Sequence, residues 1–191
     1  AATTQAGMNF VSGVAYDSSN NRLFVAQSSG KRVTVYDVAS ISDGENAVNV
    51  LGQANFTSNT SATTQSGMGT PVHIEYDGTN NRLFVSDTTS HRITIYNAAV
   101  GSIADGANAI DLLGHYSDDA ATTVVYTSDA ENNGANSLGF ENPQAVAIDT
   151  VNHRLFVADS NNNRVLVYNL NTSNQLVDRT ADNVLGQPDF R

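Results

Sequence analysis

Cysteine is absent from the 191 residues, and proline occurs only three times. Without cysteine, neither a disulfide framework nor a thiolate metal site is possible. The chain has 9 Lys and Arg against 19 Asp and Glu, which gives a net charge of −10. The basic residues are scattered singly, whereas nucleic-acid binding needs clustered Lys and Arg to displace counterions. We therefore expect no nucleic-acid partner, and anionic membrane surfaces are disfavoured for the same reason.

Long apolar runs are also missing. None approaches the roughly 20 residues that a membrane-spanning helix needs, so no membrane insertion is expected. The chain begins at Ala1 without a charged-then-apolar leader, so either a leader has been removed or the sequence is an excerpt of something longer. What is present is 40% hydrophobic residues among many Asn, Ser, Thr and Gly, a mixture typical of short strands joined by polar turns.

A seven-residue sequence recurs three times along the chain. It reads NRLFVAQ at 21–27, NRLFVSD at 81–87 and HRLFVAD at 153–159. The similarity continues on both sides, from SGVAYD, VHIEYD and QAVAID upstream to NVLGQANF, DLLGHY and NVLGQPDF downstream. Self-similarity at a long period determines the whole fold, so the repeat comes before any other feature.

Each repeat predicts four short strands. In the second repeat, apolar runs lie near 72–76, 82–86, 92–96 and 109–113. Runs of this length rich in Val, Ile, Tyr and Phe are typical of strands, and the polar residues between them are typical of turns. A unit of this size with four antiparallel strands is the blade of a β-propeller. We therefore expect an all-β chain, one propeller domain over 1–191, with blades at approximately 1–56, 57–116 and 117–191.

The combined pattern is P-x-x-V-x-x-D followed by N-R-L-F-V-A-D-S-x-N-N-R-V-x-V-Y, and it is clearest from Pro143 to Tyr168. This pattern resembles the NHL-repeat family, and the resemblance covers all three copies. It implies a β-propeller, commonly six-bladed, of a kind that serves in enzymes, RNA-binding modules, sensors and protein-binding platforms. The VLGQ-x-x-F tail resembles repeat arrays of bacterial exported proteins, which implies an extracellular or cell-surface location in a bacterium or an archaeon.

Polar residues that recur in every copy are expected to support every blade. Asp87 and Asp159 end a strand, where a carboxylate accepts backbone N–H groups of the turn. The first copy departs from the pattern with Gln27 at this position, and the second has His115 where the others have Gln. Function in a repeat protein is better sought where the copies differ.

The first such difference is the pair His73 and Glu75, which replaces two small residues in each of the other copies. Two residues apart on a strand, they share one face, and the resemblance implies the innermost strand beside the central channel. A histidine and a carboxylate can bind a metal or ion, or relay protons. The alternative is a hydrogen-bonded pair that fills the wedge between blades, and we favour it because two residues fall short of a metal-ligand set.

The second difference is a longer connection, 114–142. Within it, Asp129, Glu131 and Asn133 resemble the opening of a calcium loop, with oxygens at alternate positions and a glycine sixth. The glutamate expected at position twelve is missing, because Phe140 stands there. A polar surface loop is the favoured alternative. A third difference, Val124-Val-Tyr126, predicts an extra strand or a small apolar patch.

Catalytic motifs are absent from the sequence: there is no G-x-S-x-G elbow, no P-loop and no HExxH. We therefore predict no catalytic residues, no required cofactor, and a non-catalytic module for recognition or scaffolding that binds an unknown protein or small molecule. Two alternatives remain open. One is a metal-dependent lyase or hydrolase at the central channel, and the other is a stable part of a longer repeat array.

Three blades are too few for a closed propeller, which has four to eight, and they would leave two apolar faces open. The first eight residues, AATTQAGM, match SATTQSGM at 61–68, which follows VLGQANF and four more residues. The chain stops just after the same tail. We therefore expect a head-to-tail homodimer that self-assembles into a closed six-bladed ring with a twofold axis along its channel. In that ring the two His73–Glu75 pairs would face each other across the channel.

Overall fold

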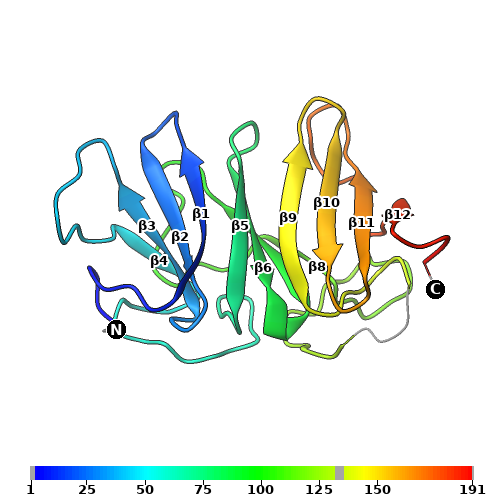
Figure 1. The fold of residues 1–191 in the computed structure, drawn as a ribbon, viewed down its shortest axis with the longest axis horizontal. Helices are drawn as coiled ribbons and strands as arrows, with labels where there is room; N and C mark the ends of the chain where they lie inside the picture. Colours follow the sequence, from blue (N-terminus) through cyan, green and yellow to red (C-terminus); the bar gives the residue numbers. More distant parts are fainter. Residues whose placement is uncertain (1–2, 132–135, 191) are drawn as a thin grey trace.

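The computed structural model describes residues 3–131 and 136–190. They form three four-stranded antiparallel sheets, each made of strands consecutive in the chain. The sheets, which we call blades one to three, stand side by side in chain order, as Figure 1 shows from blue through green to orange. The all-β architecture of three four-stranded propeller blades is thus confirmed.

Every blade has three longer strands and a short fourth one. Blade one contains β1 (Val11–Asp17), β2 (Arg22–Gln27), β3 (Arg32–Asp37) and β4 (Asn49–Leu51). Blade two contains β5 (Pro71–Asp77), β6 (Arg82–Asp87), β7 (Arg92–Asn97) and β8 (Asp111–Leu113), with a 3₁₀ turn η1 (Thr88–Ser90) between β6 and β7. Blade three contains β9 (Pro143–Asp149), β10 (Arg154–Asp159), β11 (Arg164–Asn169) and β12 (Asn183–Leu185). Within the described ranges no helix is long and apolar enough to cross a membrane.

Short polar sequences close the hairpins by the same means in each blade. In the first hairpin of blade two, the Asp77 carboxylate accepts the N–H groups of Thr79 and Asn80. The residue before the next strand is left-handed in all six hairpin turns, which asparagine tolerates better than most residues; these residues are Asn21, Lys31, Asn81, His91, His153 and Asn163. His91 and His153 are therefore turn residues.

Blades pack face to face, and the hydrophobic core lies between them. We call the face of a blade toward the preceding blade its leading face, and the face toward the following blade its trailing face. Between blades one and two, Phe24 on the trailing face meets Leu83 on the leading face, and both are fully buried. Between blades two and three, Phe84 and Leu155 do the same. The alternation of strand residues thus supplies two apolar faces per blade.

Candidate functional site

A buried arginine at the start of the third strand ties each blade together. In blade two, Arg92 Nε donates to the Asp87 carboxylate at 3.1 Å, and its other nitrogens donate to the carbonyls of Gly67 at 2.9 Å and Tyr126 at 2.7 Å. The Asp87 carboxylate also accepts the N–H of Thr70. Both charged side chains are fully buried. The arginine therefore joins the segment that leads into the blade to the segment that leaves it.

Blade three repeats this arginine cluster with Arg164, which contacts Asp159, Gly139 and Phe190. Blade one repeats it with a neutral acceptor, because Gln27 Oε1 receives Arg32 Nε at 3.2 Å. The side chains of this arginine cluster are bonded inside their own blade. This agrees with the prediction that the repeated Asp87 and Asp159 support the fold.

The structure places His73 and Glu75 together at the seam between the inner strands of blades two and three. His73 Nδ1 accepts the N–H of Val146 at 3.4 Å, and the Glu75 carboxylate accepts the N–H of Ile148. Burial lowers the pKa of His73. Burial also raises the pKa of Glu75, and the hydrogen bond from Ile148 only partly offsets this. Both groups therefore favour their neutral forms more than free side chains do.

Small residues occupy the corresponding seam between blades one and two. Gly13 replaces His73 there, and a Cβ at Gly13 would lie 3.0 Å from the Val72 carbonyl and 3.2 Å from the His73 Cα. The inner strands β1 and β5 therefore approach closely, and a side chain at this position would push them slightly apart. The His73–Glu75 pair fills a wedge that the first seam does not have. This agrees with the alternative in which the two residues form a hydrogen-bonded pair between blades.

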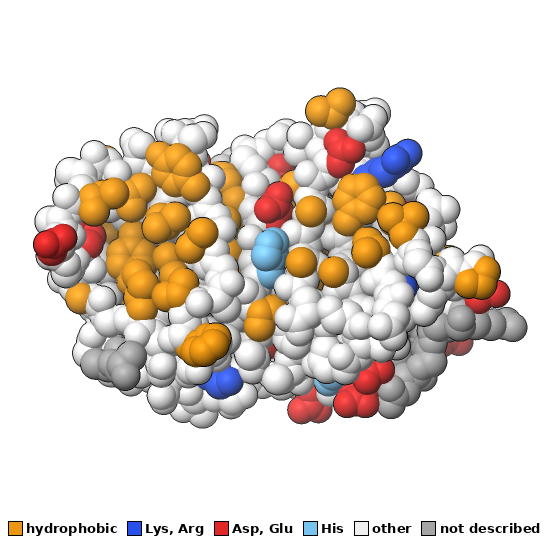
Figure 2. All heavy atoms as spheres, in the orientation of Figure 1, with side chains coloured by type: hydrophobic (Ala, Val, Ile, Leu, Met, Phe, Trp, Pro, Cys, Tyr) orange, Lys and Arg blue, Asp and Glu red, His pale blue; other side chains and the backbone are white. Residues whose placement is uncertain are grey.

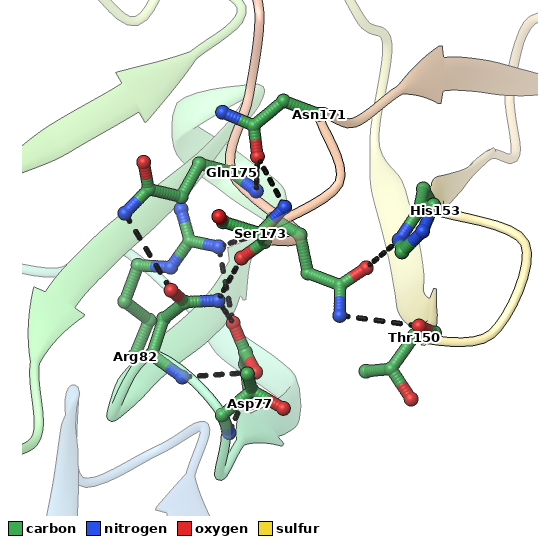
Figure 3. A network of polar contacts seen from close by, with 10 residues as sticks. Asp77, Arg82, Thr150, His153, Asn171, Ser173 and Gln175 are labelled. Carbon is green, nitrogen blue, oxygen red and sulfur yellow. Dashed lines mark hydrogen bonds and ion pairs between the residues drawn. The ribbon is translucent and has the colours of Figure 1, made fainter.

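A polar network joins the turn between β5 and β6 of blade two to residues 171–175 of blade three, as Figure 3 shows. Asp77 pairs with Arg82, and Arg82 donates to the carbonyl of Asn174 in blade three. The Asn174 side chain in turn contacts His153 and the carbonyl of Thr150. His153 is thus held by a neighbouring turn. Between blades one and two, Arg22 makes the equivalent contact with the carbonyl of Ala98 at 2.6 Å.

The long connection 114–142 contains a short hairpin, and Val124, from the stretch expected to form an extra strand or an apolar patch, lies in it. Tyr116 bridges Val124, and Asp118 accepts N–H groups within the turn. Arg179 of blade three donates to the Ala121 carbonyl and pairs with Asp111 at 2.8 Å. The hairpin is therefore held against blade three.

Tyr126, just after this hairpin, explains the apolar Val124-Val-Tyr126 stretch. Its carbonyl accepts from Arg92, as the carbonyls of Phe56 and Phe190 accept from the arginines of the other blades. Ten residues, 116–125, thus stand before the last aromatic of the blade-two tail where blade one has two, Ala54 and Asn55, so eight residues are inserted. The signal was present in the sequence as a displaced aromatic residue, but the insertion concealed its equivalence to the phenylalanines.

The candidate calcium residues lie beyond this tail. Asp129 and Glu131 are exposed, and Asn133 lies outside the described residues. Phe140, which occupies the position of the missing glutamate, is fully buried between blades two and three, where Met68 stands between blades one and two. Among residues 3–131 and 136–190, no three His, Asp or Glu side chains are grouped so that they could hold a metal.

Two apolar sheet faces at the ends of the chain have no blade against them in the described structure. On the leading face of blade one, Met8, Leu23, Tyr36 and Ile41 line a shallow hollow of about 260 Å³. Figure 2 shows hydrophobic side chains gathered over this blade. At the opposite end, the trailing face of blade three exposes Leu185.

Comparison with known proteins agrees with this architecture. Residues 140–168 match the family model described as NHL repeat. The comparison with curated proteins gives no match.

Among solved structures, 571 chains match. A chain of the nidogen/laminin complex matches with a TM-score of 0.54 and 15% identity, over 95% of this chain and 49% of that one. Hydrazine synthase of Kuenenia stuttgartiensis matches with a TM-score of 0.56 and 12% identity, over 96% and 37%. The chain thus spans half or less of the length of these two, and both matches are to β-propellers. Residues 140–168 are therefore similar to an NHL repeat, and the chain as a whole has the β-propeller fold.

Proposed function

We propose that this chain is a non-catalytic, exported module that works by binding, as a recognition or scaffolding unit. An NHL repeat on a propeller fold is compatible with a protein-interaction module. One observation carries the proposal: the pair His73 and Glu75, the strongest catalytic candidate, is engaged by backbone N–H groups of the next blade. The pair therefore helps to hold blades two and three together, whereas apolar sheet faces at both ends are available for a partner.

The competing proposal, a metal-dependent lyase or hydrolase at the channel, makes a different demand on the same pair. A catalytic His73 would have to release Val146 and take up a metal with further ligands, because a structural or catalytic zinc needs at least three protein ligands. The described residues offer this pair alone at that position. The binding module is therefore the function that the geometry supports best.

Elemental analysis tests the proposal. Protein purified without chelator should contain no stoichiometric zinc, iron or calcium, and His73→Ala should leave its metal content unchanged. Tyr126→Phe, which keeps the carbonyl that Arg92 binds, is a matched control for the purification. Stoichiometric metal that disappears with His73→Ala would contradict the proposal and favour the enzyme.

A further inference from the structure

We propose that the leading face of blade one binds the trailing face of blade three in a second copy of this chain, so that two copies close a ring of six blades. The inference rests on the proposed binding function and names the partner. It is carried by a short sequence that docks on the edge strand of the neighbouring blade at one internal junction. At the ends of the chain, blade one carries an unused copy of this sequence and blade three carries an unused copy of its target.

The docking element is the sequence S-I-x-D-G-x-N-A, which occurs at 40–47 and 102–109. In blade two it lies against the edge strand β4 of blade one. The Asp105 carboxylate accepts the N–H of Val50 at 3.0 Å, and the N–H of Gly106 donates to the Val50 carbonyl at 2.9 Å. Ile103 packs against the core between the two blades. The element therefore satisfies both backbone groups of one edge-strand residue and adds an apolar contact.

Blade one carries the same element at its leading face, where the described chain has nothing for it to meet. Asp43 and Gly44 take the places of Asp105 and Gly106, and Gly44 has the same left-handed backbone, with φ 76° against 66°. Ile41, at the position of Ile103, is 78% exposed. A preformed docking element with its apolar side chain in water marks this face as one that a partner covers.

The matching target stands at the other end of the chain. The element in blade two docks on N-V-L-G-Q at 49–53, and the same five residues recur at 183–187 in blade three. Blade two lacks this target, because its edge strand reads D-L-L-G-H and Asp111 is already engaged by Arg179. The free element and the free target therefore lie at opposite ends, and only a head-to-tail contact joins them.

The side chains on the two end faces also match the packed junctions position by position. Val14 is 61% exposed on the leading face of blade one, whereas its equivalents Ile74 and Val146 are 1% exposed in the two junctions. On the trailing face of blade three Leu185 is 52% exposed, whereas its equivalent Leu51 is 1% exposed. The two end faces therefore carry the apolar residues of one further junction between blades, half of them at each end of the chain.

A hydrogen-bond donor on blade three also agrees with this pairing. Arg22 and Arg82 each donate to a carbonyl of the following blade, at Ala98 and Asn174. Arg154 holds the same position in blade three and is exposed. The residue that corresponds to Ala98 in blade one is Val38, so the contact places the Val38 carbonyl of the second copy against Arg154.

The inner seam of the new junction would resemble the first seam. Ala145 and Ala147 stand on blade three where Gly13 and Ala15 stand on blade one. Small side chains let two inner strands approach closely, as β1 and β5 do. The two contacts between the copies would be identical and related by a twofold axis, so the assembly closes without leaving a free end.

Light scattering during size-exclusion chromatography tests the proposal on the full chain. The expected mass is about 40 kDa, twice the 20.2 kDa of one chain, and it should hold on dilution through the micromolar range because such an interface resembles a domain core cut in half. Monomers at every concentration would overturn the proposal, and so would a ladder of higher oligomers.

Two substitutions localise the contact. Ile41→Asp places a charge at the docking element and should weaken association by at least 100-fold without unfolding the chain, because the side chain is exposed there. Ile110→Asp is the matched control, since Ile110 is also a largely exposed hydrophobic residue but lies on the middle blade. Equal dissociation in both variants, or in neither, would overturn the assignment of the faces. A metal-free chain that stays monomeric would refute the second copy as partner and leave the proposed binding function standing.

Discussion

Blade one and blade two are built from the same pattern, yet only blade two is covered on both faces. Leu23 and Leu83 hold the same position; Leu23 is partly exposed and Leu83 is fully buried. Met8 and Met68 differ in the same way. The repeat has kept core residues on a face that this chain alone leaves open. Burial therefore depends on the neighbouring blade and not on the local sequence, and paired substitutions measure that dependence.

The largest difference is expected from a charge at the equivalent leucines. Leu83→Asp should abolish cooperative folding, with a loss of more than about 4 kcal/mol, because the carboxylate would be buried without a partner. Leu23→Asp should retain a cooperative transition, because its carboxylate reaches water. Urea denaturation followed by circular dichroism, with Ile41→Asp present in both proteins to keep the chains apart, makes the comparison. Equal losses would show that the two faces are covered alike.

The arginine clusters should show the next largest effect. Asp87→Ala leaves the fully buried Arg92 without its carboxylate, and removing one partner of such a pair costs about 3–5 kcal/mol. Asp87→Gln copies the Gln27–Arg32 contact of blade one and should cost about 1–2 kcal/mol, since the acceptor oxygen is retained. Urea midpoints of the two variants give the comparison. The idea fails if glutamine is as harmful as alanine.

Cavity formation at the equivalent methionines should give a smaller contrast. Met68→Ala should cost about 2–5 kcal/mol, because Met68 is fully buried between two blades. Met8→Ala should change the unfolding free energy of the dissociated chain by only about 0.5 kcal/mol, as is usual for exposed side chains. Thermal and urea unfolding of both variants, again with Ile41→Asp, provide the test. A large loss at Met8 would mean that the end face packs within one chain.

The smallest effect concerns the seam histidine. Because burial lowers the pKa of His73 below 6.5, the unfolded chain binds a proton that the folded chain does not as pH falls through this range. The stability from this group is therefore complete above pH 6.5 and is lost below it. His73→Gln should reduce the slope of the unfolding free energy below pH 6.5. Some slope should remain, since burial also lowers the pKa of His115.

Glu75 gives the control of opposite sign. Its raised pKa means that its contribution is complete below its ordinary pKa and is lost as pH rises through the folded value. Glu75→Gln should therefore leave stability at neutral pH unchanged or slightly higher, because the amide oxygen still accepts from Ile148. A clear loss at neutral pH would indicate that the charged carboxylate is needed at this seam.

The sequence was sufficient to predict the strands, the hairpin turns and the three blades, because each rests on a local pattern repeated three times. It also placed His73 and Glu75 on one face of an inner strand. It did not reveal what that face meets, since the contact is made by backbone N–H groups of Val146 and Ile148 in the next blade, which any sequence could supply. The Arg179–Asp111 pair was missed for a similar reason: its partners lie 68 residues apart, and Arg179 stands in a connection whose sequence differs from those of the other repeats.

The buried arginines have a further consequence for how such chains vary. Each one fastens the beginning and the end of its blade by backbone carbonyls, which any residue can supply. A segment inserted between β8 and Tyr126 therefore leaves the fastening intact, and the 116–125 hairpin already shows eight extra residues accommodated there. The equivalent stretch before Phe56 is a natural position for grafting a foreign peptide. Blade geometry and loop length can thus diverge independently, which lets one scaffold present many different surfaces.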